Sequence, residues 1–445
     1  MKNFLIKKRH LTSFQIIILG FATIILIGAF LLMLPISSKS GRITPFHETL
    51  FTATSAVCVT GLVVQDTASY WSLFGQVIIL ILIQIGGMGI ITVAIAFVVF
   101  SGRKISLMQR STMQEAIAAP QTGGIVRLTY FVIKVTVCLE FIGALVMMPV
   151  FYEDYGLRGI WMAIFHSVSA FCNAGFDILG TSQSPFSSLM AYRANPIINV
   201  TIIMLIIIGG IGFLTWNDIR VNRYHIKKYR MQSKVILVMT TVLVLIPTFY
   251  FYLYEYGGLP FQQRILSSLF QAVTPRTAGF NTTDLTLMSG TGQCIIIGLM
   301  LIGGSPGSTA GGMKTTTLAV LFANASAVFR RKKDANLFKR RINNDVIRNA
   351  ATIFMMYITL FVLGALIISI VENISIGECL FETASAIGTV GLTLGMTSHL
   401  GLLSQGILIG LMFFGRVGGL TLIYAAFSGV SKNLSKLPEE RITVG

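Results

Sequence analysis

Charged residues are scarce in this 445-residue chain. They make up 11% of it, and acidic residues are the rarer kind, with 17 Asp and Glu against 34 Lys and Arg. A soluble domain ordinarily carries about 25% charged residues, so this composition excludes an ordinary soluble globular protein. Hydrophobic residues take the place of the missing charges, because they reach 54% of the chain and its mean hydropathy is +0.77.

Cysteine is also sparse, with five copies in the chain. Their positions show none of the spacings of a zinc site or a disulfide framework; they are Cys58, Cys138, Cys172, Cys294 and Cys379. No group of nucleophiles or metal ligands is placed by the sequence on facing helices either. We therefore expect neither a redox role nor an enzyme.

Long apolar runs fill most of the chain. Each approaches or exceeds the ~20 residues that a membrane-spanning helix needs; the runs are residues 14–34, 73–100, 128–150, 197–216, 235–253, 347–371 and 402–427. The first is too long for a signal peptide, and Pro35 follows it instead of a small-residue cleavage site. The sequence predicts a polytopic membrane protein that retains its first helix.

Basic residues are concentrated in alternate connections between these runs. Most Lys and Arg lie in the tails 1–10 and 429–445 and in the loops 101–127, 217–234 and 330–348. Cytoplasmic loops of membrane proteins carry such an excess, so both termini are predicted to be cytoplasmic. Membrane topology thus explains the net charge of +17, and no nucleic acid is expected as a partner. The opposite connections carry acidic residues that would attract cations.

Four short stretches between the predicted spans share one pattern. They read LFTATSAVCVTGL (50–62), IFHSVSAFCNAGF (164–176), LFQAVTPRTAGF (269–280) and LFETASAIGTVGL (380–392). Each has a phenylalanine, a hydroxyl residue four positions later, and then a glycine: Phe51, Ser55 and Gly61; Phe165, Ser169 and Gly175; Phe270, Thr274 and Gly279; Phe381, Ser385 and Gly391. The third copy is one residue shorter between hydroxyl and glycine. Four copies indicate four repeated units.

A glycine cluster follows each stretch in the next apolar run, reading IGGMG, IGGIG, IGGSPG and FGRVGG. Each unit is then a helix, a re-entrant loop and a second helix. The predicted units are repeat 1, 11–100 with re-entrant loop 46–62; repeat 2, 126–220 with loop 160–176; repeat 3, 234–329 with loop 262–280 and a broken second helix over 303–317; and repeat 4, 345–428 with loop 378–392. The predicted fold is all-α, with eight spanning helices in four pseudo-symmetric units around one cation pore. In repeats 1 and 2 the cluster is expected only to let neighbouring helices approach.

The re-entrant stretches are suited to an ion filter. Non-helical backbone is tolerated at membrane depth only where protein buries it or water reaches it, and four strands around an axis can replace the hydration shell of an ion with carbonyl oxygens. Close packing of helices is the alternative role for the glycines, but four copies in one topological position favour the filter. Its oxygens are neutral, which favours a monovalent cation. The predicted filter residues are Val59, Thr60 and Gly61; Asn173, Ala174 and Gly175; Thr277, Ala278 and Gly279; and Thr389, Val390 and Gly391.

The stretch GGSPGSTAGGMKTTT (303–317) partly matches the phosphate-binding loop G-x-x-x-x-G-K-[ST]. Met313 separates Gly312 from Lys314, however, and the preceding CIIIGLMLIGG is a membrane segment rather than a β-strand. Nucleotide binding is therefore disfavoured here. Interior Gly costs ~1 kcal/mol and Pro ~3 kcal/mol relative to Ala, so we expect the helix to break over this stretch.

The segments VCVTGL, FCNAGF, PRTAGF and IGTVGL resemble the filter sequences of the Trk/Ktr/HKT superfamily of potassium transporters, over roughly residues 13–427, with the Ktr branch most similar. The resemblance implies potassium uptake across a bacterial cell membrane, and Gly61 in place of serine implies a preference for potassium over sodium. It also implies a homodimer with one pore per chain and a KtrA-like cytosolic ring of regulatory subunits that binds the nucleotide. Beyond the transported K⁺ no cofactor is expected on this chain. A sodium- or proton-coupled potassium symporter is the alternative.

The resemblance also implies an intramembrane gating loop at the broken helix of repeat 3. Arg416 takes the cluster position of Gly87 and Gly210. An Arg at a helix centre costs about 3 kcal/mol, so we expect it to pair with loop carbonyls; a partner for Glu140 is the alternative. Lys314 either anchors the cytoplasmic end of the loop or reaches toward water. The predicted gate residues are Gly303, Gly304, Ser305, Pro306, Gly307, Ser308, Thr309, Gly311, Gly312, Lys314 and Arg416.

Other polar residues lie near the predicted filter. Glu382, His166 and Gln271 each follow a shared phenylalanine, and we expect them to brace the filter rather than contact the ion. Arg276 lies within the third stretch and is expected to brace its loop. Glu140 lies in the middle of an apolar run, where it is either paired or lines water.

Overall fold

The structure, a computed structural model, describes residues 12–90, 92, 93, 112, 114, 124–419, 421, 422 and 440. The predicted tails apart from residue 440, most of the basic loop 101–127 and the ends of repeats 1 and 4 lie outside these residues. Within the described part, regular structure is helical except for one antiparallel hairpin of β1 (Asn336–Leu337) and β2 (Arg340–Arg341). The all-α class is therefore confirmed.

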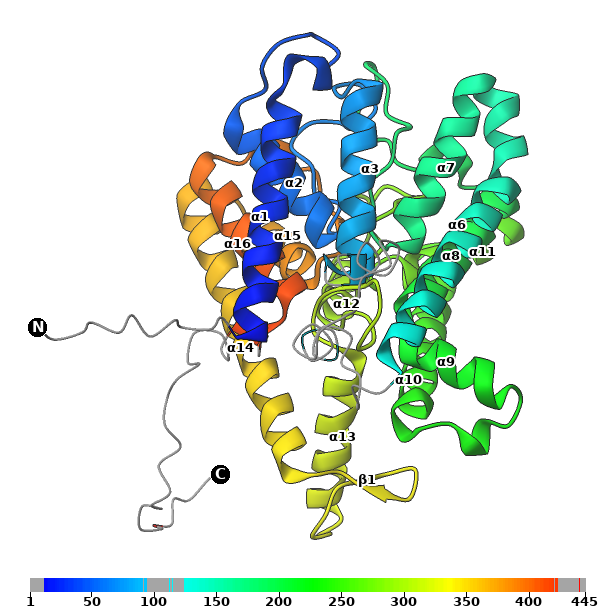
Figure 1. Cartoon of the computed structure of the whole chain (residues 1–445), viewed down its shortest axis with the longest axis vertical. Helices are drawn as coiled ribbons and strands as arrows, with labels where there is room; N and C mark the ends of the chain where they lie inside the picture. The colour runs from blue at the N-terminus through cyan, green and yellow to red at the C-terminus, as the bar shows by residue number, and fades with distance from the viewer. Residues whose placement is uncertain are drawn as a thin grey trace, which may run out of the picture.

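Each predicted repeat contains a long helix, a short helix and a further apolar helix (Figure 1). The long helices are α1 (Ser13–Met33), α6 (Ile125–Tyr155), α10 (Met231–Tyr250, continued by the π-helical η4, Phe251–Glu255) and α14 (Asn344–Glu372). The short helices are α2 (Phe46–Cys58), α7 (Leu157–Phe171), α11 (Phe261–Val273) and α15 (Ile376–Gly388). The further helices are α3 (Leu73–Met88), α8 (Pro196–Gly210), α12 (Gly290–Leu301) and α16 (Leu402–Val417), with α9 (Phe213–Asn222) after α8 and α13 (Thr315–Phe329) after α12. Short 3-10 turns are η1 (Pro35–Ser37), η2 (Met190–Tyr192), η3 (Ile226–Lys228) and η5 (Thr397–His399).

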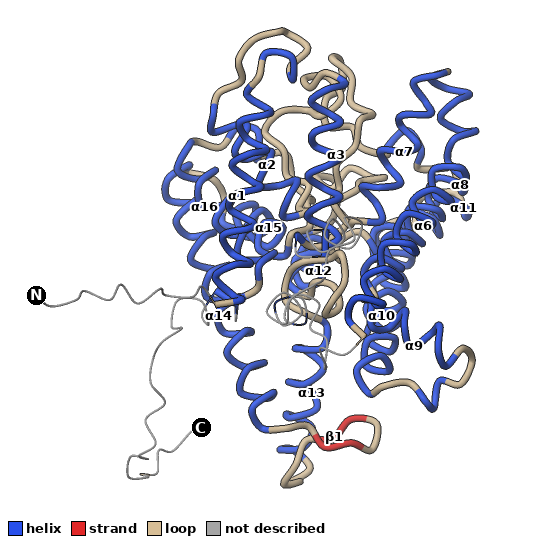
Figure 2. Tube along the Cα trace, in the orientation of Figure 1, coloured by secondary structure: helices blue, strands red, loops and turns tan. Residues whose placement is uncertain are grey.

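The short helices are enclosed by the rest of the protein. Their shared phenylalanines have an exposed fraction of 0% and are Phe51, Phe165, Phe270 and Phe381. Figure 2 shows loop segments gathered in the interior near α3, α12 and α15. Burial of this kind meets the condition under which irregular backbone is tolerated at membrane depth.

Four described helices are long and apolar enough to cross a membrane, namely α1, α6, α10 with its π-helical extension, and α14. The pair α8 and α9 would make a fifth span but is bent by 94° at its break. The apolar helices α3, α12, α13 and α16 are shorter. Within the described part, the first helix of each unit is therefore continuous, and the second is broken or short.

The second helix of every repeat ends at its glycine cluster. In repeats 1, 2 and 4 the break falls at Gly89, Gly212 and Gly418, whose φ angles are +85°, +93° and +89°. Residues with a Cβ rarely adopt such angles. A methyl group added at Gly86 or Gly209 would also lie within 3.0 Å of a carbonyl oxygen of the short helix. The prediction that the clusters of repeats 1 and 2 serve only close packing was wrong, because the same glycines also end the helix.

Candidate cation pathway

The four predicted filter glycines form a closed ring. Each one faces the residue that precedes the filter glycine of the next repeat, and a methyl group added to it would lie within 3.0 Å of that residue's carbonyl oxygen. The four contacts, in ring order, are Gly61 with Ala174, Gly175 with Ala278, Gly279 with Val390, and Gly391 with Thr60. The order therefore runs through repeats 1, 2, 3 and 4 and back to 1, with no room for a side chain at any of the four positions.

Backbone angles repeat in the same way in the four strands. Every filter glycine has a positive φ, between +69° and +94°. The residue two positions earlier also has a positive φ, although it carries a side chain: Val59 (+57°), Asn173 (+58°), Thr277 (+70°) and Thr389 (+51°). A left-handed residue other than glycine costs about 1–3 kcal/mol, so the surrounding packing must hold these strands in place.

The hydroxyl residue of each stretch holds its strand by a hydrogen bond. Ser55 Oγ accepts from the Gly61 N–H at 3.0 Å, and Ser385 Oγ accepts from the Gly391 N–H at 3.0 Å. In repeats 2 and 3 the hydroxyl instead donates at 2.7 Å to the carbonyl oxygen of the residue after the glycine, from Ser169 to Phe176 and from Thr274 to Phe280. The shorter third stretch therefore keeps its hydroxyl beside the strand.

Three side-chain oxygens of the filter residues have no hydrogen-bond partner among the described residues. They are Thr60 Oγ1, Asn173 Oδ1 and Thr389 Oγ1, all on buried residues. The Asn173 amide nitrogen donates to Thr277 Oγ1 at 3.2 Å, which leaves its oxygen unpaired. A buried polar group without a partner costs about 1–3 kcal/mol. A cation or its water would satisfy these oxygens.

A non-helical loop connects α12 to α13 and folds back so that its two ends lie side by side and parallel, at Ile302 and Met313. Its arms meet where the Gly304 N–H donates to the Gly311 carbonyl at 3.3 Å, and the Thr315 N–H donates to the Gly304 carbonyl at 3.1 Å. At the tip, Ser308 Oγ donates to the Ser305 carbonyl at 2.7 Å. The loop has left-handed glycines at Gly307 and Gly312, so its glycines are required by its shape.

The loop is bonded to the glycine clusters of repeats 2 and 4. Its backbone N–H groups donate to carbonyls that are free because the helices α8 and α16 end nearby. The pairs of donor and acceptor are Ser305 with Gly210 (3.1 Å), Thr309 with Gly209 (3.3 Å) and Gly312 with Gly415 (3.1 Å). The broken helices therefore supply acceptors for the loop, a role that the sequence pattern did not reveal.

Arg416 and Lys314 bond to the loop through their side chains. The Arg416 guanidinium donates to the Thr309 carbonyl and to carbonyls of α3, including Gly87 at 3.2 Å. One side chain thus joins repeat 4, the loop and repeat 1. Lys314 Nζ donates to the carbonyls of Ala310 (2.9 Å) and Gly311 (3.1 Å), so its charge is directed back onto the loop.

The loop also contacts a filter residue of repeat 4 and the end of the short helix of repeat 2. A methyl group on Gly311 would overlap the Thr389 hydroxyl in repeat 4. In repeat 2, Thr309 Oγ1 donates at 3.1 Å to the carbonyl of Phe171, the last residue of α7. The tip of the loop, together with Lys314 and Arg416, lines a cavity of about 360 Å³. The loop thus lies next to the filter residue Thr389 and also lines this cavity.

The remaining predicted polar residues bond outside the ring. Glu382 accepts from Thr393 Oγ1 at 2.9 Å and from Thr397, and Gln271 Oε1 accepts from Thr283 Oγ1 at 3.5 Å. These partners follow the filter strands in sequence, so both side chains hold the segments that leave the filter. His166 Nδ1 lies 2.7 Å from the Met162 carbonyl of its own helix, and Arg276 donates to Thr240 in α10 at 3.3 Å.

The TrkH family, described as cation transport proteins, matches residues 2–433 of this chain. The potassium/sodium uptake protein NtpJ of Enterococcus hirae is 40% identical over 98% of each chain. The Ktr system potassium uptake protein B of Bacillus subtilis is 37% identical over 100% of this chain and 99% of its own length. The crystal structure of the potassium transporter TrkH from Vibrio parahaemolyticus has a TM-score of 0.74 with this one at 20% identity, covering 95% of this chain and 86% of that one, and so shares its fold.

Proposed function

Because this chain belongs to the TrkH family of cation transport proteins, we propose that it takes up potassium ions across the cell membrane along the axis of its glycine ring. It is a multi-pass membrane protein, and the proteins similar to it are transporters. The observation that carries the proposal is the closed ring, because it brings one uncharged strand from each repeat to a common axis.

The four strands supply oxygens for a dehydrated cation. Carbonyl groups at such a ring replace the water ligands of an ion, and the unpaired side-chain oxygens of Thr60, Asn173 and Thr389 add further acceptors. The four short helices end at or just before the strands, so their C-terminal ends contribute roughly half a negative charge each; their last residues are Cys58, Phe171, Val273 and Gly388. The strands contain no carboxylate, which favours a monovalent cation over a divalent one.

The loop between α12 and α13 serves as the gate. It lies against Thr389 of the filter in repeat 4 and against the end of α7 in repeat 2, and its bonds to the glycine clusters hold it there. An ion that leaves the ring toward the cavity below must displace it. The many glycines of the loop allow that movement, because its backbone is not committed to a helix.

Replacing Arg416 by glutamine is expected to raise K⁺ flux. The substitution removes the charged group that is hydrogen-bonded to both the loop and α3. Hydrogen bonds to a charged group contribute about 1.5–3 kcal/mol. Their loss corresponds to about a tenfold or larger shift of the equilibrium toward the displaced loop. Arg416→Lys should give a smaller rise because it keeps the charge, and Arg127→Gln, an exposed change in the first turn of α6, should give none. Unchanged flux in a folded Arg416→Gln protein would leave Arg416 with a structural role alone.

The similarity to a Ktr system protein supports the assembly of this chain with a second copy and with regulatory subunits. The chain forms a homodimer with one pore in each copy, and a KtrA-like cytosolic ring binds the nucleotide and regulates the gate. The basic connections 217–234 and 330–348 offer a cytoplasmic surface for an acidic ring. Both termini lie on the same side as that surface.

The function is tested by cation flux into liposomes that contain the purified chain. Potassium and rubidium are expected to enter and sodium to enter much more slowly. Uptake that requires an imposed sodium or proton gradient would favour a coupled symporter instead. If no cation enters, potassium binding measured by calorimetry on the same sample decides between a closed pore, which still binds the ion, and an incorrect assignment.

A further inference from the structure

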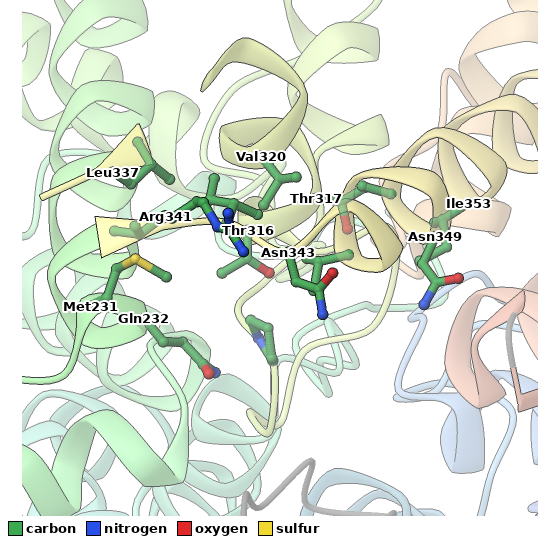
Figure 3. A pocket seen from close by; sticks show the side chains of 15 residues that line it. Met231, Gln232, Thr316, Thr317, Val320, Leu337, Arg341, Asn343, Asn349 and Ile353 are labelled. Carbon is green, nitrogen blue, oxygen red and sulfur yellow. The ribbon is translucent and has the colours of Figure 1, made fainter. Parts of the chain in front are cut away.

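A second cavity, of about 380 Å³, lies outside the proposed ion path. It is enclosed by the first turns of α10 and α13, by one face of α14 and by the β1–β2 hairpin. Figure 3 shows Met231, Leu337 and Arg341 at one end of it and Asn349 and Ile353 at the other. Its volume is within the range of about 300–1,000 Å³ that is usual for small-molecule sites.

The wall of this cavity is mainly apolar, and two of the helices that form it carry exposed apolar side chains farther along. Its apolar side chains come from all four elements and include Met231, Val235, Val320, Leu337 and Ile353. Farther along α10 and α14, apolar side chains are exposed, among them Val238 (49%) and Met355 (72%). In a membrane protein such exposed apolar positions face acyl chains, so the cavity lies where lipid reaches the cytoplasmic boundary.

The chain segment next to the cavity is strongly basic. Arg341 lines the cavity with a side chain that is 71% exposed and forms an ion pair with Asp334 at 3.7 Å. The segment from the end of α13 to the β1–β2 hairpin carries further exposed cations: Arg330, Arg331, Lys332, Lys333 and Lys339. Basic residues next to a membrane surface attract anionic lipids.

The inner end of the cavity touches the proposed gate. Pro306, at the tip of the loop, is part of its lining. The neighbours of Pro306 hold the loop to repeat 2, because the Ser305 N–H donates to Gly210 and the Gly307 carbonyl accepts from the Phe213 N–H at 2.7 Å. An occupant of the cavity would therefore contact the loop where it is attached.

We propose that an anionic phospholipid binds here, with its headgroup at Arg341 and one acyl chain extending to Pro306. The bound lipid holds the loop in the position of this structure, because a ligand shifts an equilibrium toward the conformation that contains its site. The effect on transport rests on the proposed function of the loop as a gate, whereas lipid binding itself does not. Anionic lipid therefore inhibits transport through the pore.

Binding is tested on the full-length purified chain by native mass spectrometry with phosphatidylglycerol and phosphatidylcholine. The wild-type protein should retain phosphatidylglycerol in preference to phosphatidylcholine. Arg341→Gln should weaken this retention by about fivefold, since one basic residue near an anionic surface contributes about 1 kcal/mol. Arg340→Gln is the matched control, because neighbouring residues of a strand face opposite sides and only Arg341 lines the cavity.

Occupation of the cavity is tested by filling it. Val320→Trp should abolish selective retention of phosphatidylglycerol, and Val235→Phe should reduce it if the tryptophan variant does not fold. Phe322→Trp, on an exposed face of α13, should have no effect. Equal losses in Arg340→Gln and Arg341→Gln, or full retention in Val320→Trp and Val235→Phe, would overturn the site and leave a protein segment or the regulatory ring as the occupant.

Rubidium flux gives the second measurement. Wild-type flux should be lower in vesicles with phosphatidylglycerol than in neutral vesicles, and Arg341→Gln should reduce that difference while Arg340→Gln retains it. Selective lipid binding without this difference in flux would overturn the proposed inhibition by lipid. An absence of flux in every vesicle, with selective binding intact, would count against the proposed transport function and not against the lipid site.

Discussion

The Gly391→Ala variant is expected to lose uptake of K⁺ and Rb⁺ down to the leak of empty liposomes. Gly391 has a φ of +93°, and a methyl group there would overlap the Thr60 carbonyl oxygen of repeat 1. That oxygen is one of the proposed ion ligands, so the substitution moves a ligand as well as straining the backbone by about 1–3 kcal/mol. Gly391→Asp should be equally inactive, since it also places a carboxyl group in the ring.

Gly410→Ala provides the matched control in the same repeat. Gly410 lies within α16, and a methyl group there would meet no atom within 4 Å. Alanine is also favoured over glycine inside a helix by about 1 kcal/mol, so this variant should fold and transport as the wild type does. A Gly391→Ala protein that elutes from a sizing column at the normal volume is taken as folded. If it took up cations with the rate and selectivity of the wild type, the proposed filter would be contradicted.

The four-unit organisation could be predicted because short sequence patterns specify it. A phenylalanine, a hydroxyl residue and a glycine recur at nearly fixed spacing, and each has a local physical role. The phenylalanines are buried, and the hydroxyls bond within seven residues of their own positions, as Ser55 does with Gly61 and Thr274 with Phe280. The all-α class followed from composition and is confirmed. Ion binding at the ring stays a prediction.

Contacts between distant parts of the chain could not be predicted in this way. The bond from Arg416 to the carbonyls of α3 joins residues that are far apart in sequence, and nothing in FGRVGG or IGGMG specifies it. The neighbours of Glu140 were equally hidden: Gln84 donates to its carboxylate at 3.2 Å, and the Cys172 thiol lies 3.8 Å from it. Glu140 is thus paired, as one of its two predicted alternatives stated, and its partners come from α3 and from the end of α7.

The helix breaks in repeats 1, 2 and 4 illustrate a subtler limit. A pair of glycines in an apolar run is compatible with close helix packing and with a break, and both occur at Gly209 and Gly210, where a carbonyl of α7 approaches and α8 ends. A break in a membrane is acceptable only if the freed backbone groups find partners. Those partners are the N–H groups of a loop about 100 residues away in sequence, at Ser305 and Thr309, so only the folded chain reveals the reason for the break.

Removing the tip of that loop, residues 306–309, is expected to raise K⁺ and Rb⁺ flux by at least about tenfold. The deletion eliminates the bonds from Thr309 to Gly209 and Phe171 and the acceptor of Arg416. Each neutral hydrogen bond contributes about 0.5–1.5 kcal/mol and the charged one about 1.5–3 kcal/mol, so their combined loss should favour the displaced loop. The arms can still close, because Gly304 and Ala310 already lie side by side.

The selectivity of the shortened protein distinguishes an open gate from a leak. The ring is untouched by the deletion, so the preference for potassium over sodium should equal that of the wild type, measured as the ratio of initial uptake rates. Adding Gly391→Ala to the deletion should abolish the flux again, because ions would still have to pass the ring. A folded deletion variant with unchanged or lower flux would rule out the loop as the barrier. Increased flux without selectivity would mean that the loop supports the filter instead of closing the path below it.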